Sequence, residues 1–471
     1  MNIDIKNLWK KSAAEVIGLL KSKDIKGSEV LDSCLSRIVE VNPEINAIVS
    51  IFDKEARVKI SKNNLTSVLA NMPVVIKDNT NLKGFKTTYG SRLFENNIAK
   101  FTDPSVDNIE KNGGIIFAKT NLPELGAGSH TYNDIFGLTK NPWNLNNSAG
   151  GSSGGSAAAL ASGMAWFATG NDLGGSLRNP SSWCGVVGLR PTPGLIPRGP
   201  SKLPFNNLHV EGPMARNVKD LALLLDAMTG YYNYDPLSKK IQTSLFSQKL
   251  KENNKKQIKI GFTKDFNLFP IHAQVNEMMD NTAKLIENMG YDIENSYPRM
   301  EGAEECFQTL RSISYYISYK SLLEEDNMKH LKEEIVWNIR SGSNLSISDY
   351  AKAEELRNKI YENTMDFFKK FDLLIAPSSI VPPFKSDKKW IKKIGKYTFD
   401  NYVSWMMIAA CISLTSCPSL GMATSLSEDG CPFGIQIIAP PNKENVLLEF
   451  SQHLEDNINI KSLLPRNPSI K

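Results

Sequence analysis

Two short glycine- and serine-rich stretches constrain this chain more than any other feature of its sequence. The first, at residues 150–156, reads GGSSGGS, and the second, at residues 171–180, reads NDLGGSLRNP. An alanine-rich run begins at Ala157, so the first stretch is expected to lead as a loop into a helix N-terminus. Such a terminus presents unpaired N–H groups, and glycine lets a ligand approach the backbone closely. The two stretches therefore predict a site for developing negative charge.

Strand and helix patterns alternate along the rest of the chain, which predicts an α/β fold. The apolar runs typical of buried strands lie at residues 73–76, 113–119, 186–189 and 373–376. Helical patterns lie at residues 28–41 (before Asn42 and Pro43), 53–70, 221–228, 347–371 and 444–454. Two more strands, at residues 419–425 and 433–438, flank Asp429 and Gly430 and predict a hairpin, which would make the sheet mixed. We expect one large domain over residues 1–471, with a mixed sheet covered by helices on both faces.

Composition narrows the class of protein further. The net charge of +5, from 55 basic and 50 acidic residues, is too weak to indicate a nucleic-acid partner. The six cysteines lack the spacing of a zinc site, and buried reduced thiols of a cytoplasmic protein fit them best. The start of the chain lacks a signal-peptide pattern, and the apolar-rich run at residues 405–414 is too short to span a bilayer. Residues 231–257 are polar and lysine-rich, which indicates a linker or surface excursion.

Two familiar motifs fit the first glycine stretch only in part. Residues 151–155 match G-x-S-x-G, but a nucleophile elbow needs a preceding strand, and the composition of residues 144–155 predicts a loop. The lysine of a phosphate-binding loop is replaced by Ser156. A nucleophilic serine still needs a base, and no histidine is well placed. Lys77, at the end of strand 73–76, is the candidate; alternatively its stem lies along apolar surface with its ammonium in water.

Several spaced motifs together resemble the amidase signature family. These are PVVIKDN at residues 73–79, NPW at 141–143, the two glycine stretches, CGVVGLRP at 184–191 and GPMAR at 212–216. The strong match covers about residues 70–230, and PFGIQ at residues 432–436 matches more loosely. Two departures stand out. Asn171 occupies a position where the family commonly has threonine, and residues 413–418 lack the usual asparagine and glycine.

The resemblance implies a Ser-cisSer-Lys triad and a serine acyl-enzyme. Ser176 would be the nucleophile, Ser152 the bridging serine after a cis peptide bond, and Lys77 the base. By the same resemblance, the oxyanion hole would be formed by the backbone N–H groups of Leu173, Gly174, Gly175 and Ser176. Supporting residues would be Ser153, Ser156, Asp172 and Arg178, the last two as a buried structural pair. The substrate would contact Gly126, Ala127, Gly128 and Asn179.

The resemblance also implies the class of reaction. It predicts a free-standing amidohydrolase that cleaves a carboxamide of a small molecule, with no metal or organic cofactor and no nucleic-acid or membrane partner. It favours a homodimer. The alternative is the glutaminase subunit of a tRNA-dependent amidotransferase, which works only in a complex. The loop at residues 126–133 (GAGSHTYN) and the pair Asn171 and Asp172 favour the free-standing enzyme.

Overall fold

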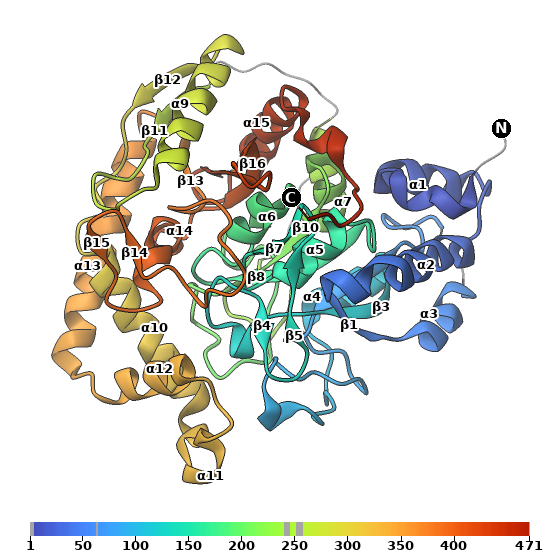
Figure 1. The fold of residues 1–471 in the computed structure, drawn as a ribbon, viewed down its shortest axis with the longest axis horizontal. Helices are drawn as coiled ribbons and strands as arrows, with labels where there is room; N and C mark the ends of the chain where they lie inside the picture. The colour runs from blue at the N-terminus through green and yellow to red at the C-terminus, as the bar shows by residue number, and fades with distance from the viewer. Residues whose placement is uncertain (1–3, 63–64, 240–244, 251–257, 471) are drawn as a thin grey trace.

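A large mixed sheet passes through the whole molecule and organises its other elements (Figure 1). The structure is a computed structural model that describes residues 4–62, 65–239, 245–250 and 258–470. Within them the sheet has eleven strands, in the order β1-β3-β2-β8-β10-β9-β16-β17-β13-β11-β12. The predicted α/β class and mixed sheet are confirmed.

The middle of the sheet carries the residues singled out by the sequence. Its strands are β3 (Ile115–Thr120), β2 (Pro73–Lys77), β8 (Phe167–Asp172), β10 (Val210–Ala215) and β9 (Val187–Arg190). β2 runs parallel to both β3 and β8, whereas β10 runs antiparallel to β8 and β9. Every residue of β2, β3 and β8 is buried, so both faces of this region are covered.

The predicted hairpin joins the two halves of the sheet. β16 (Ser419–Leu426) pairs with β9 on one side and with β17 (Pro432–Ile438) on the other. Beyond β17 lie β13 (Leu373–Pro377), β11 (Lys259–Phe262) and β12 (Asp292–Asn295), and the opposite edge is β1 (Ile48–Ile51). The hairpin therefore ties the last third of the chain to the strands that follow the second glycine stretch.

Helices pack along the sheet and around its ends (Figure 1). Two short helices start beside the glycine stretches, namely α5 (Gly154–Ala161) and α6 (Arg178–Cys184). The others are α1 (Ala13–Lys21), α2 (Gly27–Ile45), α3 (Asp53–Ile60), α4 (Pro104–Lys111), α7 (Val218–Met228), α8 (Phe246–Lys249), α9 (Ala273–Asn288), α10 (Ala303–Tyr319), α11 (Glu325–Met328), α12 (Glu333–Ser343), α13 (Ile347–Phe368), α14 (Met407–Ser413) and α15 (Glu444–Asp456). None of the described helices is long and apolar enough to cross a membrane.

Three local predictions were wrong. The helix predicted to stop before Asn42 continues as α2 to Ile45, because Pro43 lies in its last turns, where the missing N–H removes a single helical hydrogen bond. The helix predicted over residues 53–70 ends at Ile60. Residues 144–148 are a strand, β7 (Asn144–Ser148), paired with β6 (Lys140–Asn141) in a separate two-stranded sheet. Their asparagines are typical of a loop, but the side-chain amide of Asn147 is satisfied inside the protein by the carbonyl of Pro383 (2.9 Å).

The proposed linker at residues 231–257 lies partly outside the described residues, which omit 240–244 and 251–257. The described parts pack on the main body. Asp235 is buried and accepts the Arg198 N–H at 2.9 Å, and the Phe246 N–H donates to Asp226 at 2.7 Å. All six cysteines are buried, and none of these described residues forms a disulfide.

Candidate active site

The side chain of Lys77 is wholly buried at the carboxyl end of β2. Its Nζ lies 2.7 Å from Ser152 Oγ, 3.1 Å from Ser153 Oγ and 2.7 Å from Asn171 Oδ1. Burial disfavours the ammonium form and lowers the pKa of Lys77 to about 7, although the negative charges of Glu211 and Asp172 oppose this effect. The alternative in which the ammonium reaches water is therefore excluded, and a large part of the lysine population is an uncharged amine near neutral pH.

The first glycine stretch holds Ser152 against this amine. The peptide bond between Gly151 and Ser152 is cis, as the resemblance implies. Gly150 has a φ of +75°, and a Cβ there would lie 2.6 Å from Asn179 Oδ1, so the turn requires glycine. Ser156 anchors the start of α5 to the sheet, since its hydroxyl donates to the Thr169 carbonyl at 2.8 Å.

The second glycine stretch is folded around the Asp172 carboxylate. This carboxylate accepts the backbone N–H groups of Gly175 and Leu177, both at 3.0 Å, and the Arg178 guanidinium at 2.9 and 3.1 Å. The two guanidiniums of Arg178 and Arg190 hold the pKa of Asp172 well below its usual range despite full burial. The predicted buried pair thus braces the turn that presents Ser176.

Three of the four N–H groups predicted to form the oxyanion hole are not hydrogen-bonded within the described part of the chain. The N–H groups of Leu173, Gly174 and Ser176 have no acceptor among the described residues, and all three residues line a cavity. The N–H of Gly175 is already bound by Asp172. The turn therefore offers three backbone donors beside the Ser176 hydroxyl.

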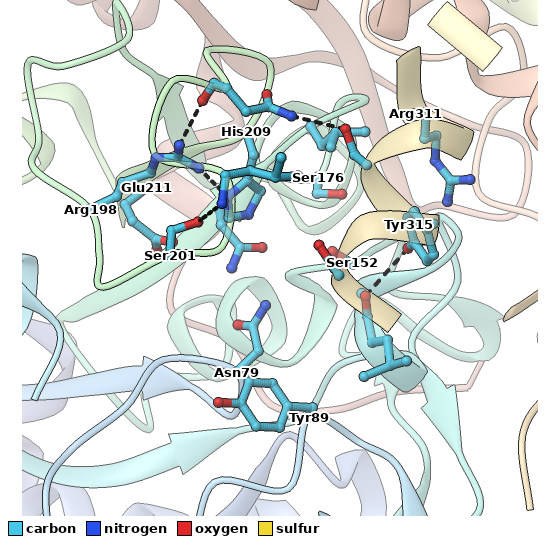
Figure 2. A pocket seen from close by; sticks show the side chains of 18 of the residues that line it. Asn79, Tyr89, Ser152, Ser176, Arg198, Ser201, His209, Glu211, Arg311 and Tyr315 are labelled. Atoms are coloured by element: carbon cyan, nitrogen blue, oxygen red, sulfur yellow. Dashed lines mark hydrogen bonds between the residues drawn. The ribbon is translucent and has the colours of Figure 1, made fainter. Parts of the chain in front are cut away.

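The cavity has a volume of about 350 Å³ and brings the two glycine stretches together with distant parts of the chain (Figure 2). Ser152, Ser176, Gly126 and Gly128 line it as expected. Ala127 and Asn179 are not among its lining residues. The side-chain carbonyl oxygen of Asn179 instead accepts the Gly151 N–H at 3.2 Å, so this side chain supports the serine loop.

One wall of the cavity comes from α10 and was not predicted. Phe307, Arg311, Tyr315 and Tyr319 repeat every four residues and line the cavity along one helix face. The Arg311 guanidinium is buried and donates to the Tyr402 hydroxyl at 2.6 Å. The four-residue spacing of three aromatic residues and one arginine is visible in the sequence and could have indicated this helix face. The partners of the arginine could not be predicted, because they lie in segments far along the chain.

The opposite wall of the cavity carries ionisable side chains, and the sequence analysis did not predict it either. In Figure 2, Arg198, His209 and Glu211 face the pocket across from Arg311 and Tyr315. Arg198 donates to His209 Nδ1 at 2.8 Å, which leaves this imidazole neutral and without a basic lone pair. Burial raises the pKa of Glu211 to about 8. The only sequence signal was the position of Glu211 directly before the GPMAR motif.

None of the other four histidines, all within the described residues, lines the cavity, so none is placed to act as the base. His130 is buried between the Ser148 hydroxyl (2.7 Å) and the Ser386 carbonyl (3.1 Å), and burial lowers its pKa to about 4. It does not line the cavity.

Comparison with known proteins gives concordant matches over almost the whole chain. The family model described as Amidase matches residues 29–448. A glutamyl-tRNA(Gln) amidotransferase subunit of Sulfurihydrogenibium sp. is 32% identical, with 94% of this chain and 96% of that protein covered. Further curated relatives, named as the same amidotransferase subunit, are 30% to 33% identical.

Solved structures of similar fold include an aryl acylamidase and an amidotransferase subunit of the same kind as these relatives. A bacterial aryl acylamidase of the amidase signature family has a TM-score of 0.90 at 25% identity, with 98% of this chain and 99% of that chain covered. The glutamyl-tRNA(Gln) amidotransferase subunit of Thermotoga maritima has a TM-score of 0.76 at 25% identity, with 100% and 99% covered.

Proposed function

Because this chain belongs to the amidase family, we propose that it is an amidohydrolase that cleaves a carboxamide C–N bond through an acyl-enzyme on Ser176. Ser152 and Lys77 relay the proton. The observation that most supports this proposal is the distance of 2.7 Å between the buried Lys77 amine and Ser152 Oγ, beside the cavity that Ser176 also lines. With a pKa of about 7, this amine is uncharged often enough to act as a base near neutral pH.

In the acylation step, Ser176 Oγ attacks the substrate carbonyl carbon. Its proton passes to Ser152, whose own proton passes to Lys77, so the relay gains one proton and the carbonyl oxygen becomes an oxyanion. The open N–H groups of Leu173, Gly174 and Ser176 stabilise that oxyanion. Donors of this kind contribute about 10²–10³ each in rate when they are fixed in place.

Collapse of the tetrahedral intermediate breaks the C–N bond. The proton held on Lys77 returns through Ser152 to the leaving nitrogen, so ammonia or an amine departs and Ser176 carries the acyl group. Water then attacks the acyl carbon, gives one proton to the same relay, and displaces Ser176, which recovers its proton. A carboxylic acid is released, and each residue ends in its starting state.

Covalent labelling tests this proposal without knowledge of the substrate. A serine-directed fluorophosphonate should label the protein once, and peptide mapping should place the label on Ser176. Ser176→Ala should lose the label, whereas Ser201→Ala, which changes another serine of the cavity wall, should keep it. Undiminished labelling of Ser176→Ala would contradict the proposed nucleophile.

Two substrate classes fit this chemistry, and a different observation favours each. A free-standing amidase, as expected from the loop at residues 126–133, is favoured by fold similarity. The TM-score to the aryl acylamidase, 0.90, exceeds that to the amidotransferase subunit, 0.76.

A glutaminase subunit is favoured more directly by sequence. The curated relatives at 30% to 33% identity are named as a subunit of glutamyl-tRNA(Gln) amidotransferase. In that case the chain would hydrolyse glutamine within an assembly that acts on glutamyl-tRNA(Gln), and the expectation of no nucleic-acid partner would not hold.

Ammonia release from the purified chain decides between the two. A free-standing amidase should hydrolyse at least one member of a panel of aliphatic, aromatic and oligomeric amides without any partner. A glutaminase subunit should be nearly inactive on glutamine alone and become active with the other subunits of an amidotransferase and tRNA. Strong glutamine hydrolysis only in the assembly would exclude the free-standing amidase.

A further inference from the structure

A row of three polar side chains crosses the middle of the sheet beside the proposed relay. Lys77 ends β2, Asn171 lies near the end of β8, and Glu211 lies near the start of β10. These strands are neighbours in the sheet, and Asn171 is the register partner of Glu211 in the antiparallel pair. Directly opposed residues of an antiparallel pair project from the same face, so both side chains lie on the side where Asn171 meets Lys77.

The amide of Asn171 has a defined orientation in this row. Its Oδ1 lies 2.7 Å from Lys77 Nζ, and its nitrogen is left for the carboxylate of Glu211, an interaction that favours the charged form of that carboxyl. An uncharged lysine amine has two N–H donors and one lone pair. If an N–H is used on the Asn171 oxygen, the lone pair remains for the Ser152 hydroxyl. A flipped amide would place its own N–H against that lone pair and compete with Ser152.

Glu211 can impose this orientation because it offers only acceptors when it is charged. One of its carboxylate oxygens is buried and has no hydrogen-bond partner among the described residues, and no described cation forms an ion pair with it. The side chain also lines the cavity. A buried acceptor that is this poorly satisfied needs a reason for its presence.

We propose that Glu211, acting through Asn171, is a positioning residue that keeps the lone pair of Lys77 directed at Ser152. This inference rests on the proposed function, because it takes Lys77 as the base. Neither residue belongs to the predicted triad, and Asn171 itself departs from the threonine that is common in the family. Asn171 and Glu211 thus extend the relay of Ser176, Ser152 and Lys77 by two positions.

The charge of Glu211 also acts on Lys77, and this gives the test a direction. The charged groups that act on Lys77 are Glu211 and Asp172, and those that act on Glu211 are Asp103, Arg198 and Lys77. A negative Glu211 favours the ammonium form of Lys77, and because the pKa of Glu211 is about 8, this effect grows as the pH rises toward that value. Removing that charge must therefore lower the pH at which the base becomes available.

The test is the pH dependence of Ser176 labelling by a fluorophosphonate between about pH 5.5 and 9.5, a range that brackets the pKa of Lys77. In Glu211→Gln the rising limb of the plot of labelling rate against pH should move toward lower pH by up to about one unit, because the negative charge that Glu211 acquires within this pH range is lost. The maximal labelling rate should fall about tenfold, because glutamine can donate to or accept from Asn171 and no longer fixes its amide. The reagent concentration at half-maximal rate should stay unchanged, since Glu211 is not proposed to contact the reagent.

Two variants control this experiment. Glu211→Asp keeps the negative charge. The rising limb of its plot of labelling rate against pH should therefore lie within about 0.3 pH unit of the wild-type limb, even if its maximal labelling rate stays low. Glu455→Gln makes the same chemical change at another buried glutamate whose pKa is also raised to about 8, on α15, where it accepts the Val218 N–H at 3.0 Å. Its profile should match the wild type.

The outcomes separate this inference from the function on which it rests. If Glu211→Gln shows the same pH dependence and the same maximal rate of labelling as the wild type, Glu211 does not position Lys77. A change confined to the half-maximal concentration would likewise overturn the inference, because it would mean that Glu211 contacts the ligand. If the wild-type protein is not labelled at Ser176 at all, the proposed function fails and the inference fails with it.

Discussion

Replacing Lys77 by methionine tests mechanism and stability in one experiment. Methionine has a similar length but cannot be protonated, so the variant should lose labelling at Ser176. It should also change how stability depends on pH. Burial lowers the pKa of Lys77 from its ordinary value of 10.5 to about 7. At about 1.36 kcal/mol per pKa unit, this difference corresponds to about 5 kcal/mol of unfolding free energy.

The direction follows from proton binding. Between about pH 7 and 10.5 the lysine is mostly neutral in the folded protein but protonated in the unfolded chain. The unfolded state binds more protons in this window, so the contribution of Lys77 to stability rises with pH. Below about pH 7 both states are protonated and the full penalty applies, whereas above about pH 10.5 it vanishes.

The stability of Lys77→Met relative to the wild type should therefore increase by about 5 kcal/mol as pH falls from about 10.5 to about 6.5, and then level off. A constant offset is superimposed, because the partners at Ser152, Ser153 and Asn171 lose a hydrogen bond at every pH, at about 1–3 kcal/mol for each buried group. The slope with pH, not the absolute difference, is thus the diagnostic quantity.

Urea unfolding of both proteins at intervals across this range measures the slope. Lys119→Met is the matched control, because Lys119 is a buried strand lysine whose pKa is lowered to about 8, but it pairs with Asp78 and does not line the cavity. This control should keep Ser176 labelling and show a smaller change, confined to about pH 8–10.5. A stability difference between Lys77→Met and the wild type that is flat over about pH 7–10.5, or a labelled Lys77→Met, would refute the assignment of Lys77 as a neutral base.

Three further substitutions probe the surrounding machinery. Ser152→Ala should lower kcat by about 10²–10⁴ and leave residual turnover, as steady-state kinetics on any amide substrate can measure; activity within about twofold of the wild type would remove Ser152 from the relay. Asp172→Asn leaves two buried guanidiniums without their counter-charge and should destabilise the protein by about 3–5 kcal/mol in urea unfolding at about pH 7, and an unchanged midpoint would contradict this. Gly175→Ala should slow Ser176 labelling, because Gly175 has a φ of +108° and its new Cβ would lie 2.8 Å from the Cβ of Ala409. Gly84→Ala is the control, because Gly84 has a φ of +87° but no atom within 4 Å of a new Cβ; its Ser176 should be labelled at the wild-type rate.

Much of the site could be predicted because it is built from local motifs. The glycine stretches need positive φ values and close packing at fixed positions, so their residue types are restricted in the sequence itself. Strand 73–76 is an unbroken apolar run, and it delivers Lys77 to a buried strand end as expected. The hairpin around Asp429 and Gly430 was equally predictable, because its turn and its two strands are contiguous.

The sequence by itself determined the α/β class, the family resemblance and the residues of the proposed triad, since each depends on short runs of neighbouring residues. Only the tertiary structure decided what surrounds them. Glu211 faces Asn171 because β10 pairs with β8, and Arg311 reaches the cavity because α10 supplies one of its walls. The asparagine-rich strand β7 is stabilised by a partner of Asn147 that lies 236 positions along the chain. Such contacts join residues that are distant in sequence, and they form only when the strands and helices that carry them have packed together.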